Sequence, residues 1–219
     1  MISVDVWSDV ACPWCYLGKH RLEAAIDASG EDVQVTWHSF QLDPTIPRGE
    51  HTPHSEALAK KFQAPVEKIQ AMNQRLVDLG AAEGLEYNFD RYIQANTRDA
   101  HRVLHLAQEH GLGNEMKDRL MRGQFTEGAI VDDADALVAM AADVGLHADE
   151  VREMLATDAY DDAVQADIDE AAALGATGVP FFVFDRMFAV SGAQPVETFV
   201  EALRRSTERR SAGRQTTVG

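Results

Sequence analysis

The chain has 219 residues, a mass of 24.1 kDa, 45% hydrophobic residues and a formal net charge of -16. This length and apolar content are enough for one elaborated domain or two small ones. The negative charge argues against nucleic acid as a partner, because the phosphates would be repelled. The sequence contains no apolar run of about 18 residues, the length that a membrane span needs.

The N-terminus begins directly with a strand-like segment and shows no export signal, which predicts a cytoplasmic protein. Both a monomer and a homodimer are compatible with this composition. Residues 2–7 alternate apolar and polar side chains, which predicts a half-buried strand. Apolar residues then recur at helical spacing from Leu17 to Ile26, and residues 33–40 alternate again as a second strand.

From about Ser55 to Leu174 the pattern is helical almost throughout, with glycines where helices should stop. Asp132 and Asp133 are candidate N-caps for one of these helices. The predicted helices cover residues 55–62, 65–83, 97–110, 114–126, 133–144, 148–156 and 159–174.

The strand pattern returns late in the chain. Residues 179–184 and 187–191 predict a hairpin with a tight turn at Asp185 and Arg186, followed by an amphipathic helix from about residue 196. Residues 206–219 lack aromatic and large aliphatic side chains except Val218, so we expect a disordered tail.

Cys12 and Cys15 are the only cysteines of the chain, and the motif Cys12-Pro13-Trp14-Cys15 lies between the first strand and the first helix. Three interpretations are open: a redox dithiol, half of a zinc site, or two inert buried thiols. Zinc normally takes four ligands, and the chain has no second cysteine pair. The redox dithiol is therefore favoured.

The position of Cys12 supports this interpretation. Pro13 suits the first position of a helix, which makes Cys12 the cap residue that faces unpaired backbone N–H groups and the positive end of the helix dipole. Both features favour a thiolate, so we expect a lowered pKa for Cys12. Cys15 follows one turn later, close enough to form a disulfide. We predict that Cys12 attacks and that Cys15 resolves.

The chain resembles the thioredoxin superfamily, and within it the DsbA-type oxidoreductases of the FrnE-like subgroup. Three segments carry the resemblance: Asp9 to Gly18 around the cysteines, Asn96 to Arg102, and Gly175 to Phe182 with its Gly-Val-Pro sequence. A Cys-x-x-Cys motif alone is weak, but its combination with Gly-Val-Pro before a late strand is specific.

The resemblance implies an α/β fold of the thioredoxin type with a large all-helical insertion. Residues 1–43 and 175–205 would form the discontinuous thioredoxin-like domain, and residues 44–174 the helical insertion. It also implies that Pro180 is a cis-proline that faces the cysteines and that the backbone of Val179 pairs with an extended substrate. Pro13 and Trp14 would contact the substrate as well.

The implied function is exchange of disulfides with protein or peptide substrates through a redox-active Cys12–Cys15 pair, without another cofactor or a metal. The alternative is a glutathione-dependent isomerase or transferase that acts on small molecules, such as 2-hydroxychromene-2-carboxylate isomerase or the kappa-class enzymes, or an accessory enzyme of a polyketide pathway. Relatives of that class generally carry a serine where Cys12 stands, so the two cysteines favour redox chemistry. Glutathione is a possible co-substrate in either case.

Other polar residues receive simpler interpretations. Relatives often hold a buried acid near the dithiol, but the spacing of Asp9 to Cys12 does not match, so we interpret Asp9 as a solvated loop residue. His51 and His54 lie in a proline-rich loop and are predicted to be solvated. His101 and His105 share one helical face, which fits a structural pair better than a metal site.

Overall fold

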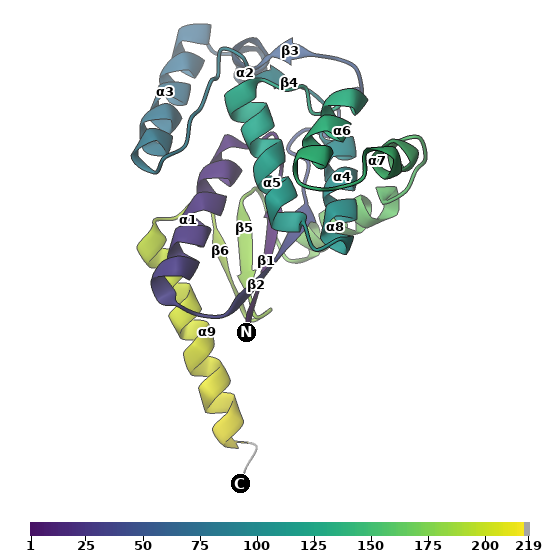
Figure 1. The fold of residues 1–219 in the computed structure, drawn as a ribbon. Helices are drawn as coiled ribbons and strands as arrows, with labels where there is room; N and C mark the ends of the chain where they lie inside the picture. The colour runs from purple at the N-terminus through teal and green to yellow at the C-terminus, as the bar shows by residue number, and fades with distance from the viewer. Residues whose placement is uncertain (217–219) are drawn as a thin grey trace.

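The computed structural model describes the backbone of residues 1–216 and the side chains of residues 1–212. Its centre is a four-stranded sheet of β1 (Ile2–Ser8), β2 (Val33–Ser39), β5 (Phe181–Phe184) and β6 (Phe188–Ser191), in the order β2-β1-β5-β6 (Figure 1). β1 runs parallel to β2, whereas β5 pairs antiparallel with both β1 and β6. The four strands predicted from the sequence are all present.

One face of the sheet is covered by α1 (Pro13–Ser29) and α9 (Val196–Thr216), which lie side by side in Figure 1. Alternate strand residues such as Val4, Val6 and Phe182 belong to the main apolar core on this face, together with Phe199 of α9. The alternation seen in the sequence therefore directs one set of side chains toward these two helices.

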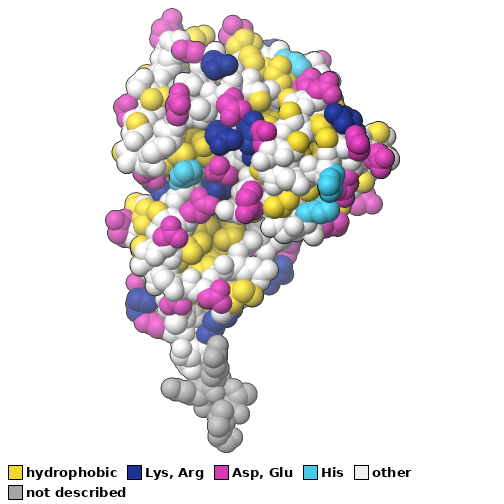
Figure 2. Space-filling view, in the orientation of Figure 1, with side chains coloured by type: hydrophobic (Ala, Val, Ile, Leu, Met, Phe, Trp, Pro, Cys, Tyr) yellow, Lys and Arg dark blue, Asp and Glu magenta, His cyan; other side chains and the backbone are white. Residues whose placement is uncertain are grey.

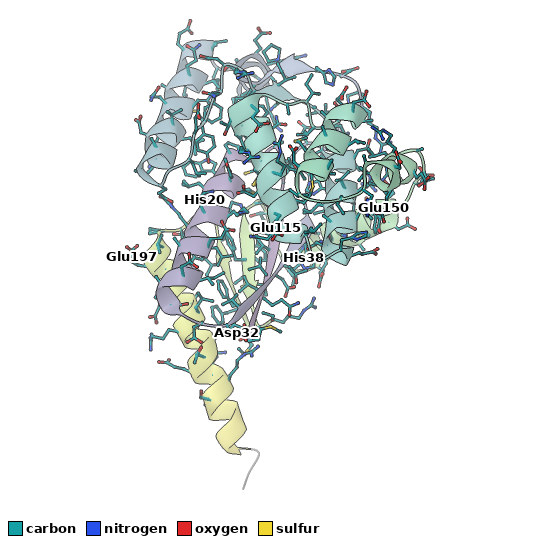
Figure 3. All side chains as sticks on the ribbon, in the orientation of Figure 1. His20, Asp32, His38, Glu115, Glu150 and Glu197 are labelled. Atoms are coloured by element: carbon teal, nitrogen blue, oxygen red, sulfur yellow. The ribbon has the colours of Figure 1, made fainter. Side chains whose placement is uncertain are left out.

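The strand side chains on the opposite face of the sheet, such as Trp7, are directed toward α8 (Asp161–Ala173). The indole N–H of Trp7 donates to the carbonyl of Asp167 at 2.9 Å, and its ring stacks on His38 with 4.4 Å between centroids. His38, labelled in Figure 3, also lies 2.7 Å from the Asp167 carboxylate and 3.1 Å from that of Asp5. These contacts bind the insertion to the sheet from this side.

Between β2 and β5 the chain forms the predicted run of helices, which lie at one end of the sheet and along its α8 face (Figure 1). Two short strands, missed by the sequence pattern because each has two residues, pair antiparallel here: β3 (Thr52–Pro53) and β4 (Ile93–Gln94). Asp133 caps its helix through the N–H of Ala136, as predicted. The helices are α2 (His54–Phe62), α3 (Val66–Ala82), α4 (Arg98–Glu109), α5 (Gly113–Arg122), the π-helical turn η1 (Gly123–Glu127), α6 (Ala134–Asp143), α7 (Ala148–Leu155) and α8.

The prediction of disorder from residue 206 is wrong for most of the tail, because α9 continues to Thr216; residues 217–219 lie outside the described part. Ser206 is fully buried, and Arg205 lies over the ring of Phe188 at 4.7 Å. Arg210 forms an ion pair with Asp185 in the β5–β6 turn. Arg205 and Arg210 therefore hold this part of α9 against the edge of the sheet. The predicted boundaries between the thioredoxin-like part and the insertion stay a prediction.

Acidic side chains are spread over the whole face drawn in Figure 2, with lysines and arginines among them singly or in small groups. This distribution fits the net charge of -16. Within the described residues, no helix is both long and apolar enough to cross a membrane.

α1 approaches the start of β5 so closely that Gly18 has no room for a side chain. A Cβ atom there would lie 2.9 Å from Cγ of Pro180 and 3.2 Å from Cζ of Phe182. The proline ring cannot bend away as a long side chain would. Gly178, two residues before Pro180, has no heavy atom within 4 Å of the place where its Cβ would stand.

We expect Gly18→Ala to lower the free energy of unfolding by about 1–2 kcal/mol, because the overpacking outweighs the gain of about 1 kcal/mol in helix propensity. Urea unfolding measures the change. Gly178→Ala is the matched control and should leave the stability within about 0.5 kcal/mol of the parent protein. Equal stability of both variants would contradict the tight contact.

Candidate active site

Cys12 and Cys15 lie at the N-terminus of α1, as the motif predicts. Cys12 is the cap residue, with φ -97° and ψ 108°, and Pro13 is the first helical residue. The backbone N–H of Cys15 donates to the carbonyl of Cys12 at 2.9 Å, which closes the first turn. Both cysteines are free thiols, 3% and 1% exposed. The two sulfurs are thus held on one helical turn and almost completely shielded from solvent.

The expected lowering of the Cys12 pKa is wrong for this state. The hydrogen bond with Cys15, burial of the sulfur and the charge of Asp9 hold the pKa of Cys12 well above its ordinary value. The backbone N–H of Cys15 lowers the pKa of Cys12 but is outweighed by the causes that raise it. The sulfur also lies 3.7 Å from the carbonyl of Val179, which accepts from a thiol but repels a thiolate. The helix N-terminus alone therefore does not decide the charge of this sulfur.

Val179 belongs to the loop that faces the dithiol, and the Val179–Pro180 peptide bond is cis. Gly18, one turn after Cys15, allows α1 to pack against the ring of Pro180. The Gly-Val-Pro segment and the cysteine motif, separated by more than 160 residues in the chain, thus meet where β1 ends and the antiparallel β5 begins.

Two tyrosines of the insertion hold the turn that carries Cys12. The hydroxyl of Tyr92 donates to the carbonyl of Ala11 at 2.8 Å, and that of Tyr87 donates to the carbonyl of Pro13 at 2.7 Å. Both rings belong to an aromatic cluster with Tyr16, Phe89 and Phe125. The sequence analysis did not identify Tyr87 and Tyr92 as residues of the site. The signal that could have found them is the concentration of aromatic residues in segment 87–92, which follows the predicted helix 65–83.

The interpretation of Asp9 as a solvated loop residue is wrong. It is 1% exposed, and its carboxylate accepts from the backbone N–H groups of Leu42 at 2.7 Å and Ala11 at 3.3 Å. Nε2 of His101 lies 3.3 Å from the same carboxylate. Burial by itself raises the pKa of Asp9, but His101 and the two N–H groups outweigh it, so the pKa is lowered. Asp9 is therefore a buried, permanent negative charge beside the dithiol.

Lys117 of α5 brings a buried cation to the same region. It is fully buried, donates to the carbonyl of Ser8 at 3.3 Å and lies over the ring of Trp37 at 5.6 Å. Burial lowers the pKa of Lys117 to about 8, although the charges of Cys15 and Asp9 act in the opposite direction. Among the described residues no carboxylate lies within ion-pair distance of its ammonium group. The helical periodicity of the sequence gave no sign of this residue.

A cavity of about 530 Å³ opens beside Cys12. One wall is formed by the cysteine turn with Pro13, Trp14 and Val179, and the opposite wall by α2 and α3. Trp14 is 39% exposed at this opening, so its predicted contact with a substrate stays a prediction that the geometry allows. Cys12 lines the cavity whereas Cys15 does not, which makes Cys12 the sulfur that a ligand can reach.

Of the two histidines predicted to be solvated, His51 is exposed and His54 is buried. His51 is exposed and pairs with Asp132 at 2.7 Å, but His54 is 4% exposed and lines the cavity, so its predicted solvation is wrong. It begins α2 and its ring stacks on Tyr92 with 4.2 Å between centroids. His101 and His105 have separate partners, in keeping with a structural pair. In the part of the chain with described side chains, no three His, Cys, Asp or Glu residues are grouped so as to hold a metal ion.

Comparison with solved structures finds this architecture elsewhere. A probable DsbA oxidoreductase from Streptomyces coelicolor is 44% identical, with a TM-score of 0.91 over 95% of this chain and 91% of the other. 2-Hydroxychromene-2-carboxylate isomerase is 16% identical, with a TM-score of 0.70 over 96% and 98% of the two chains. At that identity the second likeness shows the shared fold alone.

Sequence comparison gives the same result. The uncharacterised protein YwbO of Bacillus subtilis is 29% identical over 204 residues, which are 92% of this chain and 96% of YwbO. Residues 3–204 match the family described as the DSBA-like thioredoxin domain. With the dithiol at the start of α1, the facing Val179–Pro180 loop and this match over nearly its whole length, the chain belongs to the DSBA-like thioredoxin family.

Proposed function

We propose that the protein is a thiol–disulfide oxidoreductase that reduces disulfides of peptide or protein substrates. The observation that carries the proposal is the placement of Cys12 and Cys15 on one turn, with Cys12 alone lining the cavity. A substrate that enters there meets one sulfur first and the second only after reaction. Membership of the DSBA-like thioredoxin family, together with the two cysteines, supports this class of chemistry.

The reaction balances as two exchanges. The thiolate of Cys12 attacks one sulfur of the substrate disulfide; the substrate S–S bond breaks, a mixed disulfide forms, and the first substrate thiolate leaves and takes a proton. The thiolate of Cys15 then attacks Cys12, the mixed bond breaks, and the second substrate thiolate leaves. Two electrons and two protons pass to the substrate, and the Cys12–Cys15 disulfide remains. A small thiol such as glutathione, itself oxidised, would restore the dithiol.

The direction follows from the environment of Cys12. Thiol–disulfide oxidoreductases that are strong oxidants have a high reduction potential because their reduced form is stabilised as a thiolate. Here Cys15, burial and Asp9 raise the pKa of Cys12, so the thiolate lacks that stabilisation. The disulfide is then the comparatively favoured form, and the dithiol is a good electron donor. A reductase needs a reducing thiol pool, so we place the reaction in the cytoplasm.

Cys15 must lose its proton before the second exchange, and we propose that the amine of Lys117 accepts it. Asp9 is a poor acceptor, because its lowered pKa keeps it ionised near neutral pH. Lys117 is buried, and the charge of Cys15 is the strongest of the charges that raise its pKa, which nevertheless stays at about 8. A neutral Lys117 amine can take the Cys15 proton, and the ammonium that results stabilises the thiolate left behind.

The glutathione-dependent isomerase class is the alternative. The fold is compatible with it, as the likeness to 2-hydroxychromene-2-carboxylate isomerase shows. That reaction needs no second thiol, however, whereas here Cys15 lies one turn from Cys12 and directly influences its pKa. The resolving thiol therefore favours redox chemistry.

The function is tested by the potential of the dithiol. Equilibration in thiol–disulfide buffers, followed by alkylation and mass spectrometry, should give a value nearer to about -270 mV than to about -120 mV. Alkylation of Cys12 in the reduced protein should be slow at pH 7 and accelerate above pH ~8.5, the value of an ordinary thiol. A potential near the oxidising end would refute the reductase direction.

Cysteine variants separate the two thiols in the same assay. Cys12→Ser should lower the reduction of insulin disulfides by about a thousandfold or more, because the nucleophile is lost. Cys15→Ser should instead accumulate the mixed disulfide with the substrate, detectable by its mass. Full turnover in Cys12→Ser would exclude the dithiol mechanism.

The role of Lys117 predicts a change in the pH profile. In the parent protein the rate of the second exchange should rise as pH increases through about 8, because Lys117 then becomes a neutral acceptor. Lys117→Met should slow this step by about 10²-fold or more at pH 8 and abolish that rise. Stopped-flow decay of a preformed mixed disulfide on Cys12 measures it.

Lys19→Met is the matched control, since Lys19 is equally buried but is paired with Glu23 and Asp118. It should reduce stability without moving the pH profile. If Lys117→Met kept the parent profile, the proton would go to another group.

A further inference from the structure

Two hydroxyl groups from the insertion reach the backbone on either side of Cys12. The hydroxyl of Tyr92 donates to the carbonyl of Ala11 at 2.8 Å, and that of Tyr87 donates to the carbonyl of Pro13 at 2.7 Å. Both lengths are usual for a good O–H···O hydrogen bond. The two tyrosines are 1% and 5% exposed, so water has little access to either bond. The peptide groups before and after the cysteine are therefore both held by the insertion.

The remaining carbonyl of the cysteine turn is held within α1, where the carbonyl of Cys12 accepts from the backbone N–H of Cys15 at 2.9 Å. Ala11 lies before the first helical residue, so the regular hydrogen bonds of the helix do not reach its carbonyl, and the hydroxyl of Tyr92 supplies a donor from outside. The carbonyls of residues 11–13 thus all have donors. Rotation of one of these peptide planes would leave a buried carbonyl without a partner.

Both hydroxyls keep their proton near neutral pH. Burial raises the pKa of Tyr92, and the charges of Asp9 and Cys12 act in the same direction. Burial also raises the pKa of Tyr87, with further contributions from Tyr16 and both sulfurs. A raised pKa favours the neutral phenol, which can donate its proton to a carbonyl. The two hydrogen bonds therefore do not depend on pH in this range.

The second exchange is the step that needs a fixed backbone. The sulfur of Cys15 must reach the mixed disulfide on Cys12 in line with the bond that breaks, and a disulfide forms only when the two Cα atoms lie about 4.4–6.8 Å apart. An intramolecular step owes its rate to such geometry, and a displacement of about 1 Å can cost about 10²-fold. The first exchange has no such requirement, because an external disulfide finds its own orientation in the cavity beside Cys12.

We propose that Tyr87 and Tyr92 are positioning residues for the second exchange, because their hydroxyls fix the backbone of Cys12 and so align the mixed disulfide with the sulfur of Cys15. The inference rests on the proposed function and assigns part of its rate to the insertion. In this step the Cys15 thiolate forms the Cys12–Cys15 bond, the mixed disulfide breaks, and its electron pair leaves with the substrate sulfur, which then takes a proton. Neither tyrosine gains or loses a proton.

The test follows both exchanges with the nitrobenzoate disulfide DTNB, whose thiolate is coloured. In stopped flow with the reduced protein, one thiolate is released when Cys12 attacks, at a rate proportional to the reagent concentration. A second is released when Cys15 resolves, at a rate independent of that concentration. Tyr92→Phe and Tyr87→Phe keep the ring and remove the hydroxyl. We expect each variant to slow the second phase about tenfold and to leave the first within about twofold of the parent protein.

The reduction potential gives a second measurement, because the same alignment stabilises the Cys12–Cys15 disulfide. A tenfold loss in the effective concentration of Cys15 should raise the potential by about 30 mV in thiol–disulfide buffers. The pH at which the second phase accelerates should stay as in the parent protein, since Lys117 is unchanged. A potential equal to that of the parent protein would count against the proposal, as would a displaced pH profile.

Tyr16→Phe is the matched control. Tyr16 belongs to the same aromatic cluster, but among the described residues its hydroxyl does not donate to the carbonyls of the cysteine turn. It should leave both phases unchanged, at a temperature where melting curves show every variant to be folded. The proposal is overturned if Tyr92→Phe and Tyr87→Phe slow both phases equally, if they slow neither, or if Tyr16→Phe slows the second phase as much as they do.

The reagent separates this inference from the proposed function. DTNB is not a peptide, so its two phases report the geometry of the dithiol whether or not the protein reduces peptide or protein disulfides. A selective loss of the second phase in the tyrosine variants supports positioning even if the parent protein does not reduce insulin. Unchanged phases in a protein that does reduce insulin would refute the positioning and leave the reductase function in place.

Discussion

The buried carboxylate of Asp9 fixes the cysteine turn. It accepts hydrogen bonds from Ala11 in the turn itself and from Leu42 after β2, and it contacts His101 of α4. A charge without solvent must keep all these partners, because losing one leaves an uncompensated buried ion. The end of β1, the exit of β2 and the helical insertion are therefore held in one arrangement. Tyr92, on the carbonyl of Ala11, fixes the same turn from the insertion.

The insertion is consequently a part of the active site. It covers both sulfurs, so the field of the α1 N-terminus acts on Cys12 together with burial, Asp9 and Cys15, and these last three prevail. The same helix start exposed to solvent would favour the thiolate of its cap cysteine more strongly. The helices that follow β2 thus bury the two sulfurs, while the strand–helix junction supplies the cysteines themselves.

Local patterns were sufficient for most of the fold. The strands alternate, the helices have apolar faces of period 3.6 and end at glycines, and Pro13 marks the start of α1, so each can be recognised within a short window. The end of α9 could not be recognised in this way, because one of its contacts joins Arg210 to Asp185, 25 residues earlier in the chain. A lack of large apolar side chains indicates disorder only where no distant contact holds the segment.

Asp9 and His54 were misread for the same reason. Each stands in a segment that looks like a polar loop, and each is buried by residues of another segment: His101 lies 92 positions from Asp9, and Tyr92 stacks on His54 across the β3–β4 pair. The nucleophile is different, since Cys12, Pro13 and Cys15 form a motif whose geometry is contained in a single helical turn. The position of the dithiol can therefore be predicted from this sequence, whereas the burial of Asp9, Cys12 and His54 depends on tertiary contacts and becomes visible only in the structure.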